Sequence, residues 1–154
     1  MGTSTDGQIC FGITFEEGHE FPWNKVDEYA EIEDWWAYDV HGLKHSVELF
    51  DGAGNYLNGR EPSKEEKRRY FDEIRAFKDA HPLPVTLVNY CSGDCPMYVL
   101  AAPGSVRKAS RGNPTEFDPS ALCVAAEEVE ALTRFCQEHG LEGEPKWLLT
   151  SYWG

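Results

Sequence analysis

The feature that most constrains this fold is an alternation between two spacings of apolar residues. The segment from Gln8 to Phe15 alternates at period two, which is typical of a β-strand with one buried face. From Val26 to about Tyr38 the apolar residues instead recur at three- and four-residue steps, the spacing of an amphipathic helix. Each such segment must bury its apolar face against another element. The chain therefore needs a sheet and helices packed together.

The remaining segments extend this pattern. Ser63 and Glu66 form a capping box, which predicts the start of a helix that ends at His81-Pro82. Asp118 followed by Pro119 predicts the start of another helix, which ends at Gly140. The expected buried face of the first of these helices holds Tyr70, Phe71, Ile74 and Phe77. Further strands are predicted at residues 46–50, 84–90, 96–102 and 146–153. The predicted fold class is α+β, with a mainly antiparallel sheet, about three helices and the order β-α-β-α-β-β-α-β.

The chain length and its hydropathy limit the number of domains and the possibility of a membrane span. The 154 residues favour a single domain over residues 1–154. No apolar run approaches the roughly 18–20 residues that a membrane span requires. We therefore expect a soluble chain in the cytoplasm with no membrane contact. Residues 104–119 are expected to form a polar loop with a basic spot at Arg107, Lys108 and Arg111.

The formal net charge of −13 is concentrated at one end of the chain. Residues 1–40 contain ten acidic side chains and one basic side chain, Lys25. Four of these acids, which share one face of the predicted helix over residues 26–38, are Asp27, Glu28, Glu31 and Asp34. Like charges at this spacing destabilise a helix by a few tenths of a kcal/mol per pair. A role in solubility explains such a face as well as a role in binding does.

The binding hypothesis is that these fixed carboxylates resemble a nucleic-acid backbone to a basic partner protein. A basic groove gains affinity for DNA by neutralising phosphates and releasing counterions. A folded surface of carboxylates competes for the same lysines and arginines. Trp35 is the predicted aromatic anchor of this surface, and Trp36 is the tryptophan expected in the core. Direct binding of nucleic acid is disfavoured because the net charge repels phosphate.

Candidate catalytic and metal-binding groups are sparse, and we predict no cofactor, no metal and no catalytic residue. Asp39, His41, His45 and Glu48 are the best metal candidates, but Gly42 interrupts the two histidines and the expected metalloprotease glutamate is absent. Cys91 and Cys95 have three residues between them, which favours a hairpin turn with half-buried thiols over a redox or zinc pair. A small metal- or cysteine-dependent enzyme stays an alternative, with His81 the nearest base to Cys91 in the sequence.

The acidic segment Glu16-Glu17-Gly18-His19-Glu20 and the run from Glu31 to Trp36 resemble the small acidic accessory proteins of tailed bacteriophages. The resemblance covers about the first 36 residues. It implies an anti-CRISPR or other counter-defence inhibitor that binds a basic host protein, such as a CRISPR effector complex, in the cytoplasm of a bacterial cell. A second alternative is a virion structural or assembly protein. Its homo-oligomer contact would be formed by Trp147, Tyr152 and Trp153.

Overall fold

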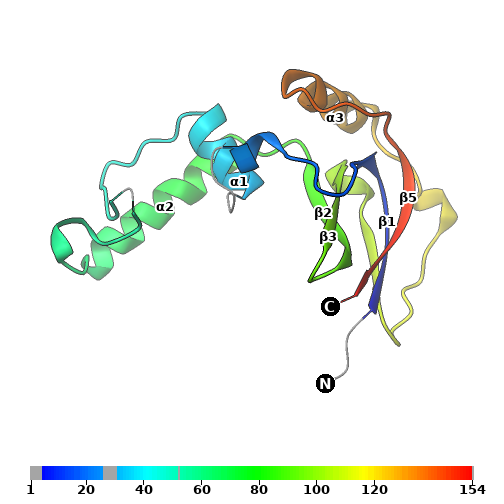
Figure 1. Cartoon of the computed structure of the whole chain (residues 1–154), viewed down its shortest axis with the longest axis horizontal. Coiled ribbons are helices and arrows are strands. Elements are labelled where there is room, and N and C mark those ends of the chain that lie inside the picture. The colour runs from blue at the N-terminus through cyan, green and yellow to red at the C-terminus, as the bar shows by residue number, and fades with distance from the viewer. Residues whose placement is uncertain (1–4, 26–30, 52, 154) are drawn as a thin grey trace. The chain divides into compact units, whose positions relative to one another are not determined.

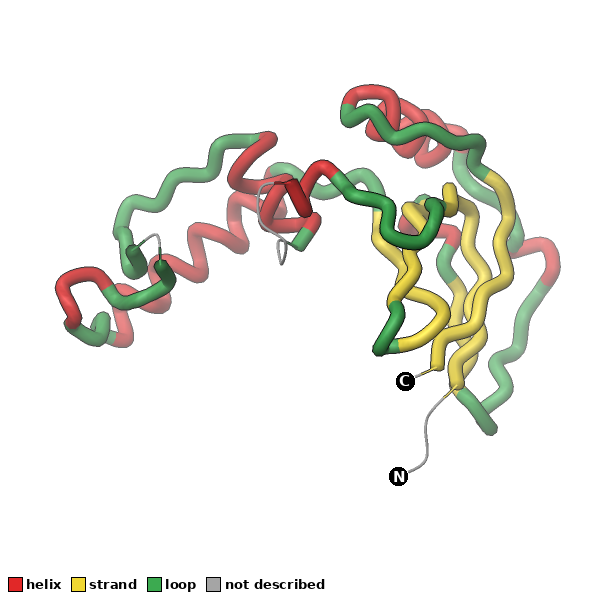
Figure 2. The backbone as a smooth tube through the Cα atoms, viewed as in Figure 1, coloured by secondary structure: helices red, strands yellow, loops and turns green. Residues whose placement is uncertain are grey.

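The computed structural model describes residues 5–25, 31–51 and 53–153. Contacts between residues divide the chain into two compact units. The sheet unit comprises residues 1–22 and 84–154, and the helical unit comprises residues 23–83. Every strand of the described residues belongs to the sheet unit, whereas α1 and α2 belong to the helical unit (Figure 1, Figure 2). The single domain over residues 1–154 stays a prediction.

The predicted fold class is confirmed, with three α-helices and a mainly antiparallel five-stranded sheet. The strand order is β3-β2-β5-β1-β4. The strands are β1 (Thr5–Thr14), β2 (Thr86–Ser92), β3 (Pro96–Ala101), β4 (Arg107–Ser110) and β5 (Lys146–Trp153). The chain order agrees with the predicted one in outline, with β4 added in a segment that we expected to be loop.

The sheet is strongly curled around its core. β1 pairs with β5 from Thr5 to Gly12, and at its carboxyl end it also pairs with β3. Because β2 joins β3 to β5, these four strands close on one another. The enclosed core consists of Cys10, Val88, Val99 and Ala101, with Tyr90, Val106 and Leu148 packed against it.

The third helix is shorter than its sequence signals predict. The Asp118 side chain accepts a hydrogen bond from the Ser120 amide, but it caps only a single 3₁₀ turn, Pro119–Ala121. α3 begins later, at Ala126, and ends at Glu138 before Gly140, which has a positive φ of 68°. α3 buries Leu132, Phe135 and Cys136. The aspartate-proline pair therefore caps only this local turn, and it does not mark the start of α3.

The helical unit does not contain the continuous amphipathic helix that we predicted over residues 26–38. Its described part begins with α1 (Ile32–Trp35), which continues directly as a π-helical turn, Trp36–Val40. Glu31 is the residue that caps α1, and its backbone is extended, with φ −81° and ψ 144°. An extended residue interrupts the helical ladder. Glu31 therefore cannot continue a helix from Asp27 and Glu28, which lie outside the described residues.

α2 (Lys64–Ala80) confirms the predicted helix after Ser63, including its capping box. None of its residues is fully buried. The Tyr70 ring stacks on His45 at 3.9 Å between centroids, and the Trp36 indole donates to the carbonyl of His81 at 3.1 Å. Phe71, which we expected on the buried face, is 54% exposed.

The strand predicted at residues 46–50 is reduced to a single bridge between Phe50 and Tyr56. The turn that follows is formed as its composition predicts. One Asp51 carboxylate oxygen accepts from the amides of Ala53 and Asn55, at 2.9 and 2.8 Å. These hydrogen bonds hold the pKa of Asp51 below its ordinary value. Among the described residues this segment pairs with no strand beyond its own turn, so it forms no ladder.

The capping box makes the stability of α2 depend on pH. The Glu66 pKa is lowered from 4.5 to about 2, first by the Arg60 guanidinium and then by the backbone and side chain of Ser63. A carboxyl whose pKa is depressed by folding stabilises the fold above its unfolded pKa, and this contribution is lost as pH falls through the folded pKa. We expect the free energy of unfolding to fall as pH drops from about 5 to 2, and to fall less steeply in Glu66→Gln.

Urea titrations at several pH values, followed by circular dichroism, measure this slope. The control is Glu65→Gln, which removes a neighbouring carboxyl outside the capping box and should keep the wild-type slope. An unchanged slope in Glu66→Gln would contradict the assignment.

No helix among the described residues is long and apolar enough to cross a membrane.

Candidate functional site: an acidic turn on an aromatic cluster

The residues predicted to bind a partner are not presented as one charged face. Asp27 and Glu28 lie outside the described residues. Glu31 is exposed at the extended residue before α1. Asp34 is exposed but is neutralised by Lys78, whose Nζ lies 2.8 Å from the Asp34 carboxylate. The base that pairs with Asp34 comes from α2, so the charge imbalance of residues 1–40 is partly removed by the fold.

The assignment of the tryptophans in this segment is reversed. Trp35, the predicted anchor, is only 6% exposed, and its ring contacts Trp23 at 5.6 Å between centroids. Trp36, the predicted core residue, is half-buried. Trp35 therefore stabilises the helical unit and does not offer a free surface for a partner.

The candidate metal ligands are drawn into separate contacts. His45 Nε2 lies 2.8 Å from the Tyr38 hydroxyl, and its Nδ1 lies 3.8 Å from Glu73. The His41 ring instead packs between Trp36 and His81. No group of three or more potential metal ligands forms among the residues that the structure describes.

Cys91 and Cys95 flank the turn of the β2–β3 hairpin, as predicted, but both are exposed and not half-buried. The Cys95 thiol donates a hydrogen bond to the Glu17 carboxylate at 3.4 Å. This bond to a carboxylate raises the pKa of Cys95 above its ordinary value. A raised pKa lowers the thiolate fraction, which disfavours a nucleophilic or redox role for Cys95.

Part of the predicted polar loop over residues 104–119 is a strand, β4. Arg107 and Lys108 lie in β4, and Arg111 follows in a turn. The Arg107 guanidinium donates to the carbonyls of Gly104 and Val106, at 2.8 and 2.9 Å. These bonds hold Arg107 against its own backbone.

The two units differ in how their charges are compensated. The helical unit has 14 acidic and 9 basic side chains, a formal charge of −5, and the sheet unit has 13 acidic and 5 basic, a formal charge of −8. The ion pairs between described residues all join side chains of the helical unit. The carboxylates of the sheet unit make no ion pair with a described residue. The uncompensated negative charge therefore belongs mainly to the sheet unit.

Within the sheet unit, several exposed carboxylates lie together in one turn that packs on aromatic side chains. Glu16, Glu17 and Glu20 are exposed in the turn between β1 and the 3₁₀ turn Pro22–Lys25. The His19 amide donates to the Glu16 carbonyl at 3.1 Å, and Gly18 supplies the positive φ of 75°. We call residues 16–20 the acidic turn.

An aromatic cluster fixes the acidic turn to the β2–β3 hairpin. The Phe15 ring lies 4.7 Å from His19 and 4.9 Å from Phe21, and Phe21 lies 5.9 Å from Tyr98 of β3. Phe21 is buried, whereas His19 is exposed. A shallow groove of about 100 Å³ runs between this turn and Pro96, Met97 and Tyr98. Edge-to-face contacts of this kind restrict the rings and hence the turn that carries them.

Within the sheet unit, the sequence segments next to the acidic turn and in the hairpin that supports it contain no lysine or arginine. Residues 1–22 and residues 84–106 contain no lysine or arginine, and the hairpin adds Asp94 at its tip. The spacing of residues along the sequence does not predict that Phe15, Phe21 and Tyr98 support the acidic turn, because Tyr98 is distant in the sequence. The available signal was the pair of phenylalanines, Phe15 and Phe21, that flanks the glutamates.

Comparison with protein-family models, with curated proteins and with solved structures finds no match to this chain.

Proposed function

We propose that the chain is a binding protein that docks the acidic turn and its surroundings on a basic, nucleic-acid-binding partner. The observation that carries the proposal is the set of three exposed glutamates in a turn held by aromatic side chains, with no lysine or arginine in residues 1–22 or 84–106. A partner with clustered lysines and arginines supplies the missing counter-charge.

The electrostatics of this arrangement favour fast, salt-sensitive association. Carboxylates of one sign create a potential that steers a basic surface toward the sheet unit. Because the turn is rigid, little conformational entropy is lost when it is bound. The aromatic cluster adds apolar surface beside the charges, and aromatic residues are frequent among the side chains that contribute most to binding.

The resemblance to acidic accessory proteins of bacteriophages supports a specific biological form of the proposal. The protein would be a phage-encoded inhibitor acting in the cytoplasm of the bacterial host. Its partner would be a defence protein with a nucleic-acid groove, such as a CRISPR effector complex. Glu31, Asp27 and Glu28 stay candidate contacts in this proposal, whereas Asp34 is already paired.

Three matched variants test the location of the interface. The first neutralises the acidic turn with Glu16→Gln, Glu17→Gln and Glu20→Gln. The second neutralises ion-paired or flanking acids of the helical unit with Glu61→Gln, Glu65→Gln and Asp72→Asn. The third changes Asp27→Asn, Glu28→Gln and Glu31→Gln. All three alter the net charge equally.

Tagged protein is used to capture partners from bacterial lysate, and the affinity for the captured protein is measured at two salt concentrations.

We expect the acidic-turn variant to bind at least about tenfold more weakly, because each charged contact contributes roughly 1.5–3 kcal/mol where it is well formed. The helical-unit variant should bind as the wild type does. The captured protein should lose DNA or RNA when the wild-type chain is added. Equal affinity of all three variants, or simultaneous binding of nucleic acid, would overturn the proposal.

A further inference from the structure

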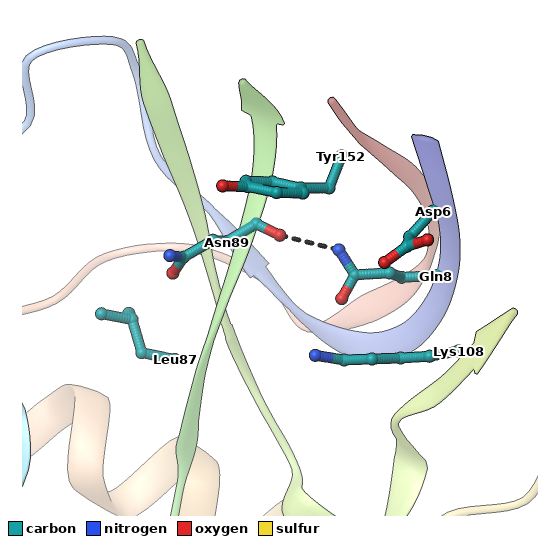
Figure 3. Close-up of a pocket in the computed structure, with 6 residues that line it drawn as sticks. All are labelled: Asp6, Gln8, Leu87, Asn89, Lys108 and Tyr152. Atoms are coloured by element: carbon teal, nitrogen blue, oxygen red, sulfur yellow. Dashed lines mark hydrogen bonds between the residues drawn. The ribbon is translucent and has the colours of Figure 1, made fainter. Parts of the chain in front are cut away.

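A polar groove of about 360 Å³ lies in the sheet unit, away from the acidic turn (Figure 3). It is lined by Asp6, Gln8, Leu87, Asn89, Lys108 and Tyr152. These residues come from β1, β2, β4 and β5. The groove is near the lower end of the roughly 300–1,000 Å³ that ligand pockets occupy, so its occupant would be small.

Gln8 is the centre of the groove and is the most unusual residue in it. The residue is only 4% exposed, yet it is polar and uncharged. Its Nε2 donates to the carbonyl of Asn89 at 2.7 Å. Because a carbonyl can only accept, this bond fixes the orientation of the amide. Gln8 Oε1 is thereby left buried with no hydrogen-bond partner among the described residues.

A second orphaned polar atom lies next to Gln8. Thr150 is directly opposite Gln8 in the β1–β5 pairing, and its hydroxyl is also buried without a partner in the described part of the chain. An unsatisfied buried acceptor costs about 1–3 kcal/mol. A ligand that donates hydrogen bonds here would recover that free energy.

The groove also carries one charge of each sign. Lys108 is opposite Gln8 in the β1–β4 pairing, and Asp6 is one diagonal step away on the same face. Diagonal neighbours of this kind are about 7–8 Å apart. Neither side chain makes an ion pair with a described residue. Figure 3 shows the Gln8 amide between the Asp6 carboxylate on one side and the Lys108 side chain on another, with Tyr152 and Asn89 facing it and Leu87 beyond Asn89.

We infer that this groove binds a free α-amino acid. Its ammonium group donates to the Asp6 carboxylate and to Gln8 Oε1, and its carboxylate accepts from the Lys108 ammonium. Leu87 and Tyr152 provide the contact for an apolar side chain. The inference is independent of the acidic turn and of any partner protein.

Charge selects this class of ligand over the other small polar molecules. A nucleotide would bring several negative charges into a unit with a formal charge of −8. A simple amine would leave Lys108 beside a second cation, and a simple carboxylate would leave Asp6 beside a second anion. A zwitterion has no net charge and satisfies both groups and the orphaned Gln8 acceptor together.

Isothermal titration of the full chain with each of the twenty standard amino acids tests the inference. We expect binding by one or more amino acids with apolar side chains. The N-acetyl derivative and the methyl ester of the best ligand each remove one of its charges. Each should bind at least about tenfold more weakly. This comparison uses only wild-type protein, so it does not depend on the folding of a variant.

Variants locate the site. Asp6→Asn and Lys108→Gln should each weaken binding about tenfold, whereas Lys146→Gln, at the opposite end of β5, should leave it unchanged. Absence of binding by every amino acid would overturn the inference. Binding of the N-acetyl derivative or of the methyl ester that is as tight as binding of the parent amino acid would also overturn it, as would a loss in Lys146→Gln equal to the loss in Asp6→Asn. None of these outcomes depends on the acidic turn, whose neutralised variant should bind the amino acid as the wild type does.

Discussion

Gly12→Ala is expected to destabilise the sheet unit by about 3 kcal/mol or more. Gly12 lies where β1 leaves β5 and pairs with β3, opposite Ala101. A Cβ at this position would overlap the Leu100 carbonyl oxygen, and would lie 2.7 Å from Val99 Cγ1 and 2.8 Å from the Ala101 Cα. Two of these contacts are with backbone, which cannot rotate away. The strands would have to separate where the sheet closes.

Gly7→Ala is the matched control, because it makes the same substitution in the same strand. A Cβ at Gly7 would meet only the Ala109 carbonyl oxygen, at 4.0 Å. We expect a change within about 1 kcal/mol, and a small gain is expected because alanine has less conformational freedom than glycine in the unfolded chain. Urea denaturation followed by circular dichroism measures both variants. Similar stabilities of the two would contradict the close approach at Gly12.

Leu132→Ala is expected to cost about 2–5 kcal/mol of unfolding free energy, which is the second large effect. Leu132 lies on the buried face of α3 and is 0% exposed, next to Phe135 and Cys136 in the same core. Removing its side chain leaves a cavity that neighbouring residues fill only partly. The loss combines the transfer free energy of the removed carbons with the cost of the cavity.

Leu149→Ala provides the comparison with a leucine on the surface of the same unit. Leu149 lies in the middle of β5 but is 82% exposed. We expect its substitution to change stability by about 0.5 kcal/mol or less. Both variants are measured by the same denaturation experiment. A loss at Leu149 that equals the loss at Leu132 would show that the outer face of β5 is covered in solution, as the homo-oligomer alternative requires.

The sequence predicted those elements whose signals are contained in a few neighbouring residues. The capping box of Ser63 and Glu66 marked the start of α2 correctly, and the aromatic-rich segment from Lys146 to Trp153 marked β5 to the residue. A cap or a strand period is satisfied locally, so the sequence contains the whole signal. The aspartate-proline signal was also satisfied locally, but by a 3₁₀ turn, and it therefore misplaced the start of α3.

The candidate site could not be predicted in the same way, because it depends on contacts between distant residues. Asp34 loses its free charge to Lys78, which is 44 residues away. Phe21 supports the acidic turn by packing on Tyr98, which lies in the β2–β3 hairpin, far away in the sequence. A count of acids along the sequence therefore located the charge near the amino terminus but could not separate the paired carboxylates from the unpaired ones.

The sequence alone determined that this chain would be an acidic α+β protein with a capped helix and an antiparallel hairpin, because periodicity and capping act over a few residues. Only the tertiary structure decided that Trp35 would be buried, that Gln8 would lie in the interior with an unpaired oxygen, and that β1 would close against β3. Trp35 is buried by packing that includes Trp23. The other two outcomes follow from which distant strands pair, and the sequence of a strand does not by itself identify its partner.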